Sequence, residues 1–76
     1  MTEQIYQQNF GEWMREQRDE LGVKQSDLAA RLGVSDRSVQ NWERGLARMS
    51  AYTERRIRAV FRQEREVVAQ RKQVTV

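Results

Sequence analysis

Three glycines divide this chain into segments of helical length. Gly22, Gly33 and Gly45 follow one another at intervals of eleven and twelve residues, and the 76-residue chain contains no proline. Glycine often ends a helix in a left-handed conformation that other residues avoid. No stretch alternates apolar and polar residues for long enough to form a half-buried strand. The sequence therefore predicts an all-helical protein whose helices stop at these glycines.

The short chain limits the ways in which the fold can be stabilised. A domain of this size buries only about 60% of the surface that its unfolded chain exposes. The sequence has no cysteine and no histidine, so disulfides and the commonest metal ligands are lacking. We therefore expect no metal, no cofactor, and self-association as a further source of stability. The lack of cysteine, of a long apolar run and of an apolar leader predicts a cytoplasmic protein that does not contact membranes.

Apolar residues at helical spacing predict four helices between these stops. The expected ranges are about Gln8 to Leu21, Gln25 to Leu32, Asp36 to Arg44, and the residues after Ser50 to about Arg71. Ser35 and Ser50 can cap the third and fourth helices, because a serine hydroxyl accepts a hydrogen bond from an amide of the first turn. A break near Gln63 would split the last helix and give five. The predicted organisation is a flexible leader at residues 1–7, a domain at 8–62, and a helical extension with a short tail at 63–76.

Each predicted helix has one apolar side, which we expect to face the core except at Val67 and Val68. The residues on these sides are Phe10, Trp13, Met14 and Leu21, then Leu28, Ala29 and Leu32, then Val39 and Trp42, and finally Tyr52, Ile57, Val60, Phe61, Val67 and Val68. In the third helix, nearly all of the remaining residues have side chains that form hydrogen bonds. The outward side of this helix is therefore a candidate binding surface.

The basic residues are concentrated in the second half of the chain. Residues 1–34 hold six acids and four bases, a balance of −2, whereas residues 35–76 hold five acids and ten bases, a balance of +5. Such an asymmetry is typical of a protein that turns one side toward a polyanion, because binding phosphates releases condensed counterions. A solvated, arginine-rich helix face is the alternative that charge alone leaves open.

The most specific pattern lies at residues 25–44, which read QSDLAARLGVSDRSVQNWER. Ala29 is expected to be small because two helices approach closely there, and Gly33 supplies the turn between them. The residues expected to form an apolar wedge between the helices are Leu28, Leu32, Val34, Val39 and Trp42. This wedge would set the angle between the helices and so the direction in which the third helix points its polar side.

Together with Trp-Glu-Arg-Gly at residues 42–45, this pattern resembles the helix-turn-helix of the Cro and phage-repressor family, also called the XRE family. The resemblance covers about Phe10 to Ile57. It implies a compact lambda-repressor-like domain that binds double-stranded DNA by placing a recognition helix in the major groove. A helical hairpin in some other small bundle is the alternative interpretation.

The resemblance also implies roles for individual residues. Base contacts would come from Asp36, Arg37, Gln40 and Asn41, and phosphate contacts from Gln25, Ser35, Ser38, Arg44 and Arg48. Arg18 and Glu43 match the family's largely buried ion pair, which we interpret as structural. Asp36 departs from the neutral or basic residue usual at its position, and an acid near phosphates is unfavourable unless it accepts from a cytosine or orients Arg37. The alternative for the base-contacting residues is a solvated helix face.

The fourth helix differs from many family members because no break is evident that would fold the chain back into a fifth helix. We expect Val67, Val68 and the tail to dock a second copy of the chain. A solvent-exposed, charged extension is the alternative.

Two functions are therefore considered. The first is a homodimeric transcription regulator, a repressor of a phage or mobile element that binds a palindromic operator. The second is a protein-interaction module of the antitoxin or anti-repressor type that uses its last helix. Catalysis is not expected, because the sequence lacks histidine, cysteine, a glycine-rich phosphate loop and a convincing pair of carboxylates.

Overall fold

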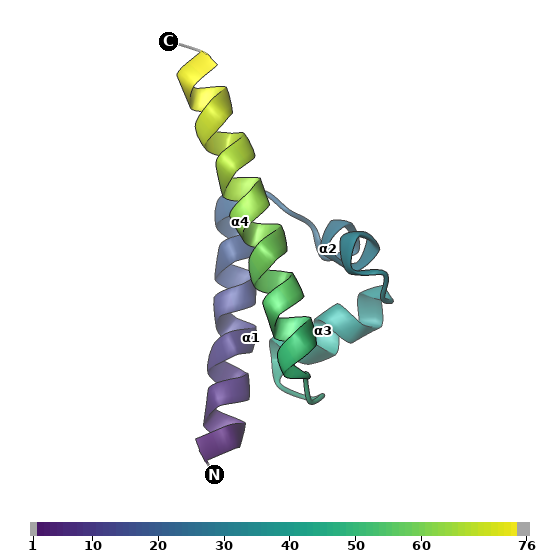
Figure 1. Ribbon diagram of the computed structural model, residues 1–76. Helices are drawn as coiled ribbons and strands as arrows, with labels where there is room; N and C mark the ends of the chain where they lie inside the picture. Colours follow the sequence, from purple (N-terminus) through teal and green to yellow (C-terminus); the bar gives the residue numbers. More distant parts are fainter. Residues whose placement is uncertain (1, 75–76) are drawn as a thin grey trace.

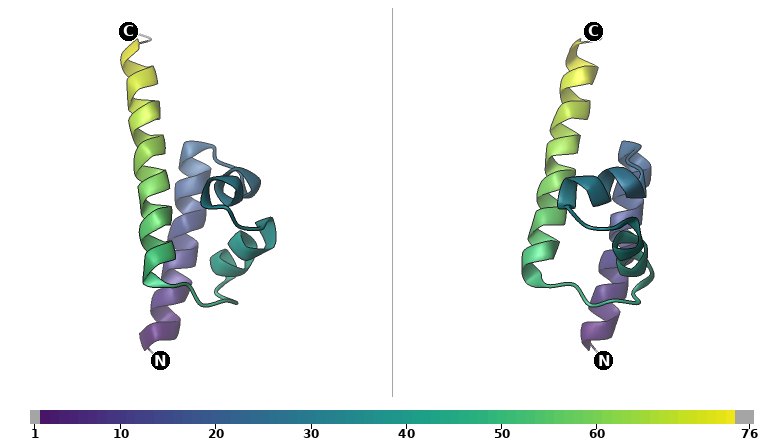
Figure 2. Two further views of the ribbon diagram at one scale, coloured as in Figure 1. Left: turned by 45° about the vertical axis from the view of Figure 1, so that its right-hand side comes forward. Right: turned by 90° about the vertical axis from the view of Figure 1, so that its right-hand side faces the viewer.

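The computed structural model describes the backbone of residues 2–74 and the side chains of residues 10–71. Within these residues the protein consists of four helices, α1 (Thr2–Leu21), α2 (Gln25–Leu32), α3 (Asp36–Arg44) and α4 (Ala51–Val74). The two long helices α1 and α4 run side by side in the same direction, and the short helices α2 and α3 pack on one side of this pair (Figures 1 and 2). The prediction of an all-helical domain with a long C-terminal helix is confirmed.

Helix α1 is longer than predicted, because it begins at Thr2 and not near Gln8. The backbone of residues 2–7, expected to form a leader, is helical. These residues include neither glycine nor proline, so nothing in their backbone preferences opposes a further helical turn.

Helices α2 and α3 have the bounds that the sequence predicts, and local hydrogen bonds explain both ends of the turn between them. Gly33 adopts a left-handed φ of 72° at the end of α2. The amides of Gly33 and Val34 donate to the carbonyls of Ala30 and Ala29 at 3.3 and 3.0 Å. The hydroxyl of Ser35 then accepts from the amide of Ser38 at 3.2 Å, so it caps α3 as expected.

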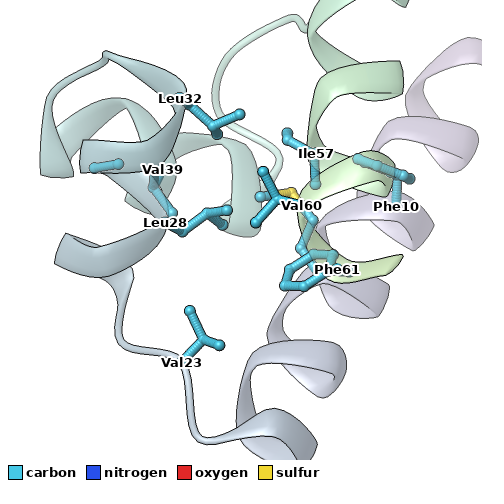
Figure 3. Close-up of a cluster of buried hydrophobic side chains, with 10 residues drawn as sticks. Phe10, Val23, Leu28, Leu32, Val39, Ile57, Val60 and Phe61 are labelled. Carbon is cyan, nitrogen blue, oxygen red and sulfur yellow. The ribbon is translucent and has the colours of Figure 1, made fainter. Parts of the chain in front are cut away.

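All four helices contribute to one hydrophobic core (Figure 3). The largest fully buried side chains are Phe61, Met14, Leu28, Ile57 and Val39. Burial of each such side chain contributes about 1.5–3 kcal/mol to folding. Trp13, Leu21, Val34, Trp42 and Met49 are partly buried and pack around this core. The α2–α3 unit is thus held against α1 and α4 by the same cluster that holds α1 and α4 together.

A close contact between α1 and α3 depends on Gly11. A Cβ atom built on Gly11 would lie 2.5 Å from the carbonyl oxygen of Trp42 and 2.7 Å from that of Glu43. Both atoms belong to the backbone of α3 and cannot move aside as a flexible side chain can. Only glycine lets the two helices approach to this distance, a constraint that the sequence analysis did not identify.

Helix α4 is continuous from Ala51 to Val74, so the expected single long helix forms and the alternative with a break near Gln63 and a fifth helix does not. Ser50 caps it as predicted, because its hydroxyl accepts from the amide of Thr53 at 3.1 Å. Tyr52 was expected in the core but is 65% exposed. The buried Ile57 lies five positions after Tyr52, which places the two side chains about 140° apart around the helix. Tyr52 lies instead under the guanidinium of Arg56, 5.8 Å from its ring centre.

Side chains also tie the end of α2 to α4. The guanidinium of Arg56 donates to the carbonyl of Leu32 at 3.0 Å and faces that of Arg31 at 3.5 Å. These carbonyls end α2 and have no partner within the helix. Arg31 in turn forms an ion pair with Glu64 and donates to the amide oxygen of Gln63 at 2.8 Å. These contacts bury little surface area, but they orient the helix-turn-helix relative to α4.

Candidate nucleic-acid interface

Helix α3 separates its polar side from its buried side. Val39 and Glu43 are buried, and Trp42 is half-buried against the core. The predicted base-contacting residues Asp36, Arg37 and Gln40 are exposed, and Asn41 is half-buried. The side chains expected to contact bases therefore lie on the side of α3 that faces away from the core.

The residues expected to contact phosphates flank this exposed side. Ser35 is exposed and Ser38 half-buried at the start of α3, where their hydroxyls lie 3.1 Å apart. Arg44 in the last turn and Arg48 in the loop that follows are both exposed. Arg44 lies at one end of α3 and Arg48 just beyond it, and the serines lie at the other end, so together they border the exposed side of the helix.

A buried carboxylate fixes the back of α3 to the rest of the domain. The carboxylate of Glu43 accepts from Nε of Arg18 at 2.5 Å and from Nη2 at 2.9 Å. Arg18 also donates to the carbonyl of Val23 at 3.1 Å. The two side chains are only 12% and 3% exposed. The hydrogen bonds that Arg18 donates to Glu43 raise the pKa of Arg18 against the opposing effect of burial, so the guanidinium keeps its charge.

Gln25 belongs to the same cluster, which the sequence analysis did not foresee. Its amide nitrogen donates to Oε1 of Glu43 at 3.0 Å, and the residue is half-buried. An amide nitrogen carries two hydrogens, so one of them remains for an acceptor outside the protein. Gln25 therefore links the start of α2 to α3 and retains the capacity to contact a phosphate.

Arg15 lies near the predicted interface although the sequence analysis did not name it. It is exposed, and together with Glu12, Glu43 and Arg44 it lines a shallow hollow between α1 and α3. The spacing of Arg15 and Arg18 would have indicated this position, because residues three apart share one side of a helix and Arg18 is expected to pair with Glu43 of α3. The guanidinium of Arg15 extends the positive charge around Arg44 onto α1.

Comparison with protein families identifies the class of this domain. A helix-turn-helix family model matches residues 14–60, which are more than half of the chain. The chain therefore belongs to the helix-turn-helix family of the Cro and XRE type and is a DNA-binding transcription regulator. No curated protein and no solved structure matches it.

The part of the chain that the structure describes holds neither a membrane-spanning helix nor a cluster of metal ligands. Across residues 2–74, no helix combines the length and the apolar character that crossing a bilayer requires. Among the side chains described, no three histidine, cysteine, aspartate or glutamate residues cluster in a way that could hold a metal ion.

Proposed function

We propose that the protein is a sequence-specific repressor that inserts α3 into the major groove of double-stranded DNA and binds as a homodimer. The observation that carries this proposal is the division of α3 into a buried side anchored through Glu43 and an exposed side of hydrogen-bonding residues. A helix that reads base edges needs a rigid mount, because small errors in its position misalign every contact.

The exposed side of α3 has suitable chemistry for base recognition. Arg37 can donate two hydrogen bonds to O6 and N7 of guanine, and Gln40 or Asn41 can form a matching pair with N6 and N7 of adenine. Each such pair discriminates by about 1–3 kcal/mol against the wrong base. Asp36 accepts from the amino group of cytosine or orients Arg37.

The flanking residues provide contacts that are independent of sequence. Gln25, Ser35, Ser38, Arg44 and Arg48 contact phosphates and fix the register of α3 on the duplex. The free amides at the start of α2 add to this contact, because helix N-termini attract anions.

The homodimer follows from the size of the recognised surface. One helix reads only a few base pairs, whereas two copies related by a two-fold axis read two half-sites about 34 Å apart in successive major grooves. Such a dimer binds a palindromic operator. Occupation of an operator that overlaps a promoter excludes polymerase and represses transcription.

Selection of bound sequences from random double-stranded DNA tests this proposal. We expect a palindromic motif with two half-sites one helical turn apart. The Arg37→Ala variant should lose preference at one position of each half-site and leave the others unchanged. Enrichment of no motif, or a motif that is identical for wild type and Arg37→Ala, would contradict the proposed recognition by α3.

A protein-interaction module of the antitoxin or anti-repressor type is the second candidate. The observation in its favour is the far half of α4, where Val67 is 41% exposed. Co-purification at a fixed stoichiometry with one unrelated protein, together with no salt-sensitive retention on DNA, would favour this module over the repressor.

A further inference from the structure

The far half of α4 extends past the other helices. Within residues 2–74, α1 ends at Leu21 and the chain turns toward α2, whereas α4 continues to Val74 (Figures 1 and 2). The side of α4 that packs in the core continues with it, because Val67 and Val68 each follow a buried core residue, Val60 and Phe61, by seven residues, which is close to two helical turns. Val67 is 41% exposed and Val68 half-buried. An apolar surface therefore extends beyond the point where the core of this chain can cover it.

The charges beside these valines are arranged symmetrically. Glu64 precedes Val67 by three residues, and Arg71 follows Val68 by three. At helical spacing all four residues lie on one side of α4. In an antiparallel pair centred between the valines, residue 64 of one helix lies opposite residue 71 of the other. A parallel pair would place glutamate against glutamate and arginine against arginine.

We propose that α4 pairs with α4 of a second copy in antiparallel orientation, with the valines at the two-fold axis and Glu64 opposite the partner's Arg71. This inference rests on the homodimer of the proposed function and specifies its interface. The contact is isologous, so each ion pair occurs twice. The charges set the orientation of the pair, and the valines supply buried apolar area.

A hollow beside Glu64 has the chemistry to receive the partner's Arg71. It lies at the corner where α1 turns into α2, and its charged lining residues are the acids Asp27 and Glu64 and the bases Arg31 and Arg71. Glu64 uses Oε1 to pair with Arg31, and a carboxylate has a second oxygen that can accept from another guanidinium. Asp27 adds a second carboxylate to this hollow, beside the positive charges of Arg31 and of this chain's own Arg71.

The proposed pairing is compatible with the spacing of two half-sites. Gly11 lies against α3, and the neighbouring Phe10 lies under Arg58 of α4, 5.0 Å from ring centre to guanidinium. Helix α3 is therefore level with Arg58. From Arg58 to the midpoint between the valines is about 14 Å of helix, which the two-fold axis doubles to about 28 Å. This separation along α4 is close to the roughly 34 Å between successive major grooves.

Charge reversal tests the pairing without altering the recognition helix. We expect Glu64→Arg and Arg71→Glu each to weaken self-association by about tenfold or more in sedimentation equilibrium, because like charges then face each other. An equimolar mixture of the two variants should form a heterodimer, and the double variant should regain the homodimer. Glu64→Arg also breaks the ion pair with Arg31. If this loss unfolds the variant, Arg71→Glu still tests the pairing, because it changes an exposed residue.

The matched controls are Glu66→Arg and Arg62→Glu, which make the same charge changes at exposed positions off the proposed interface. They should dimerise like wild type. Equal dimerisation of all variants, or a mixture that does not form a heterodimer, would overturn the antiparallel pairing. Binding to a DNA duplex with a single half-site is measured for every variant. If only the antiparallel pairing is wrong, wild type and all variants still bind this half-site. If the proposed function is wrong, wild type does not bind it either.

Cross-linking tests the orientation directly, since the natural chain has no cysteine. Under oxidising conditions, Glu64→Cys mixed with Arg71→Cys should give a disulfide-linked dimer, whereas Glu64→Cys alone should not. Efficient cross-linking of Glu64→Cys to itself would indicate a parallel pair and overturn the proposal.

Discussion

At the scale of single residues, Gly11 shows how tertiary contact can reverse a local preference. Within an exposed helix, replacing glycine by alanine stabilises by about 0.5–1 kcal/mol. Here the new methyl group would meet the backbone of α3 at 2.5 Å. Helix propensity therefore predicts that Gly11→Ala stabilises the fold, whereas steric packing predicts that it destabilises the fold.

We expect Gly11→Ala to destabilise the fold by about 1–3 kcal/mol, the usual cost of overpacking a close contact. Urea unfolding at fixed protein concentration measures the effect. A midpoint that stays the same or rises would show that α1 and α3 are not held as close as the structure indicates.

Gln17 is a second residue whose role only the structure reveals. It is 7% exposed, and its amide oxygen has no hydrogen-bond partner among the residues described. A buried acceptor without a partner costs about 1–3 kcal/mol. Replacement by an apolar side chain of similar size removes this cost.

Gln17→Leu should therefore raise the free energy of unfolding by about 1 kcal/mol or more. Gln70→Leu, at an exposed position of α4, is the matched control and should change stability by less than about 0.5 kcal/mol. A loss of stability in Gln17→Leu would mean that the amide is paired through a buried water or an alternative rotamer.

The ion pair between Arg18 and Glu43 gives a third prediction. Arg18→Leu leaves the buried carboxylate without its main partner and should destabilise by about 3–5 kcal/mol. The double variant Arg18→Leu with Glu43→Leu should be clearly more stable than the single one, because no charge is then stranded. A double-mutant cycle from urea unfolding measures this coupling, and simple additivity would contradict it.

At the scale of elements, α3 is expected to divide its residues between two kinds of DNA contact. Asn41→Ala should weaken binding to a selected operator by about 1–3 kcal/mol and relax preference at one base pair. Arg44→Ala should weaken binding to all sequences alike and lower the slope of log affinity against log salt by about one. Fluorescence anisotropy with matched and scrambled duplexes at several salt concentrations distinguishes the two.

A control for this experiment is Arg65→Ala, an exposed arginine on the far half of α4. It should leave both the affinity and the salt slope unchanged. If Asn41→Ala and Arg44→Ala behave alike, α3 does not separate base recognition from phosphate binding.

At the scale of the whole molecule, the two long helices connect the recognition surface to the proposed dimer contact. Helix α3 rests on α1 through Gly11 and the ion pair of Glu43, and α1 packs along α4. Helix α2 is tied to α4 through Arg31 and Arg56. Both helices of the DNA-binding unit are thus fixed to α4, whose far half carries Val67. The spacing between two recognition helices would then depend on one rigid element in each copy.

Residues that lie close together in the chain encode several features of this fold. The ends of α2 and α3 and the serine caps follow from glycine and serine at specific positions, and the helix-turn-helix follows from residues that lie close together in the chain. Contacts between residues that are distant in the chain could not be predicted in this way, because they form only when the helices pack together. The approach of Gly11 to α3, the burial of Gln17 and the contact of Gln25 with Glu43 depend on the relative placement of separate helices. Periodicity shows which side of a helix is apolar, but packing geometry decides which atoms of another helix that side meets.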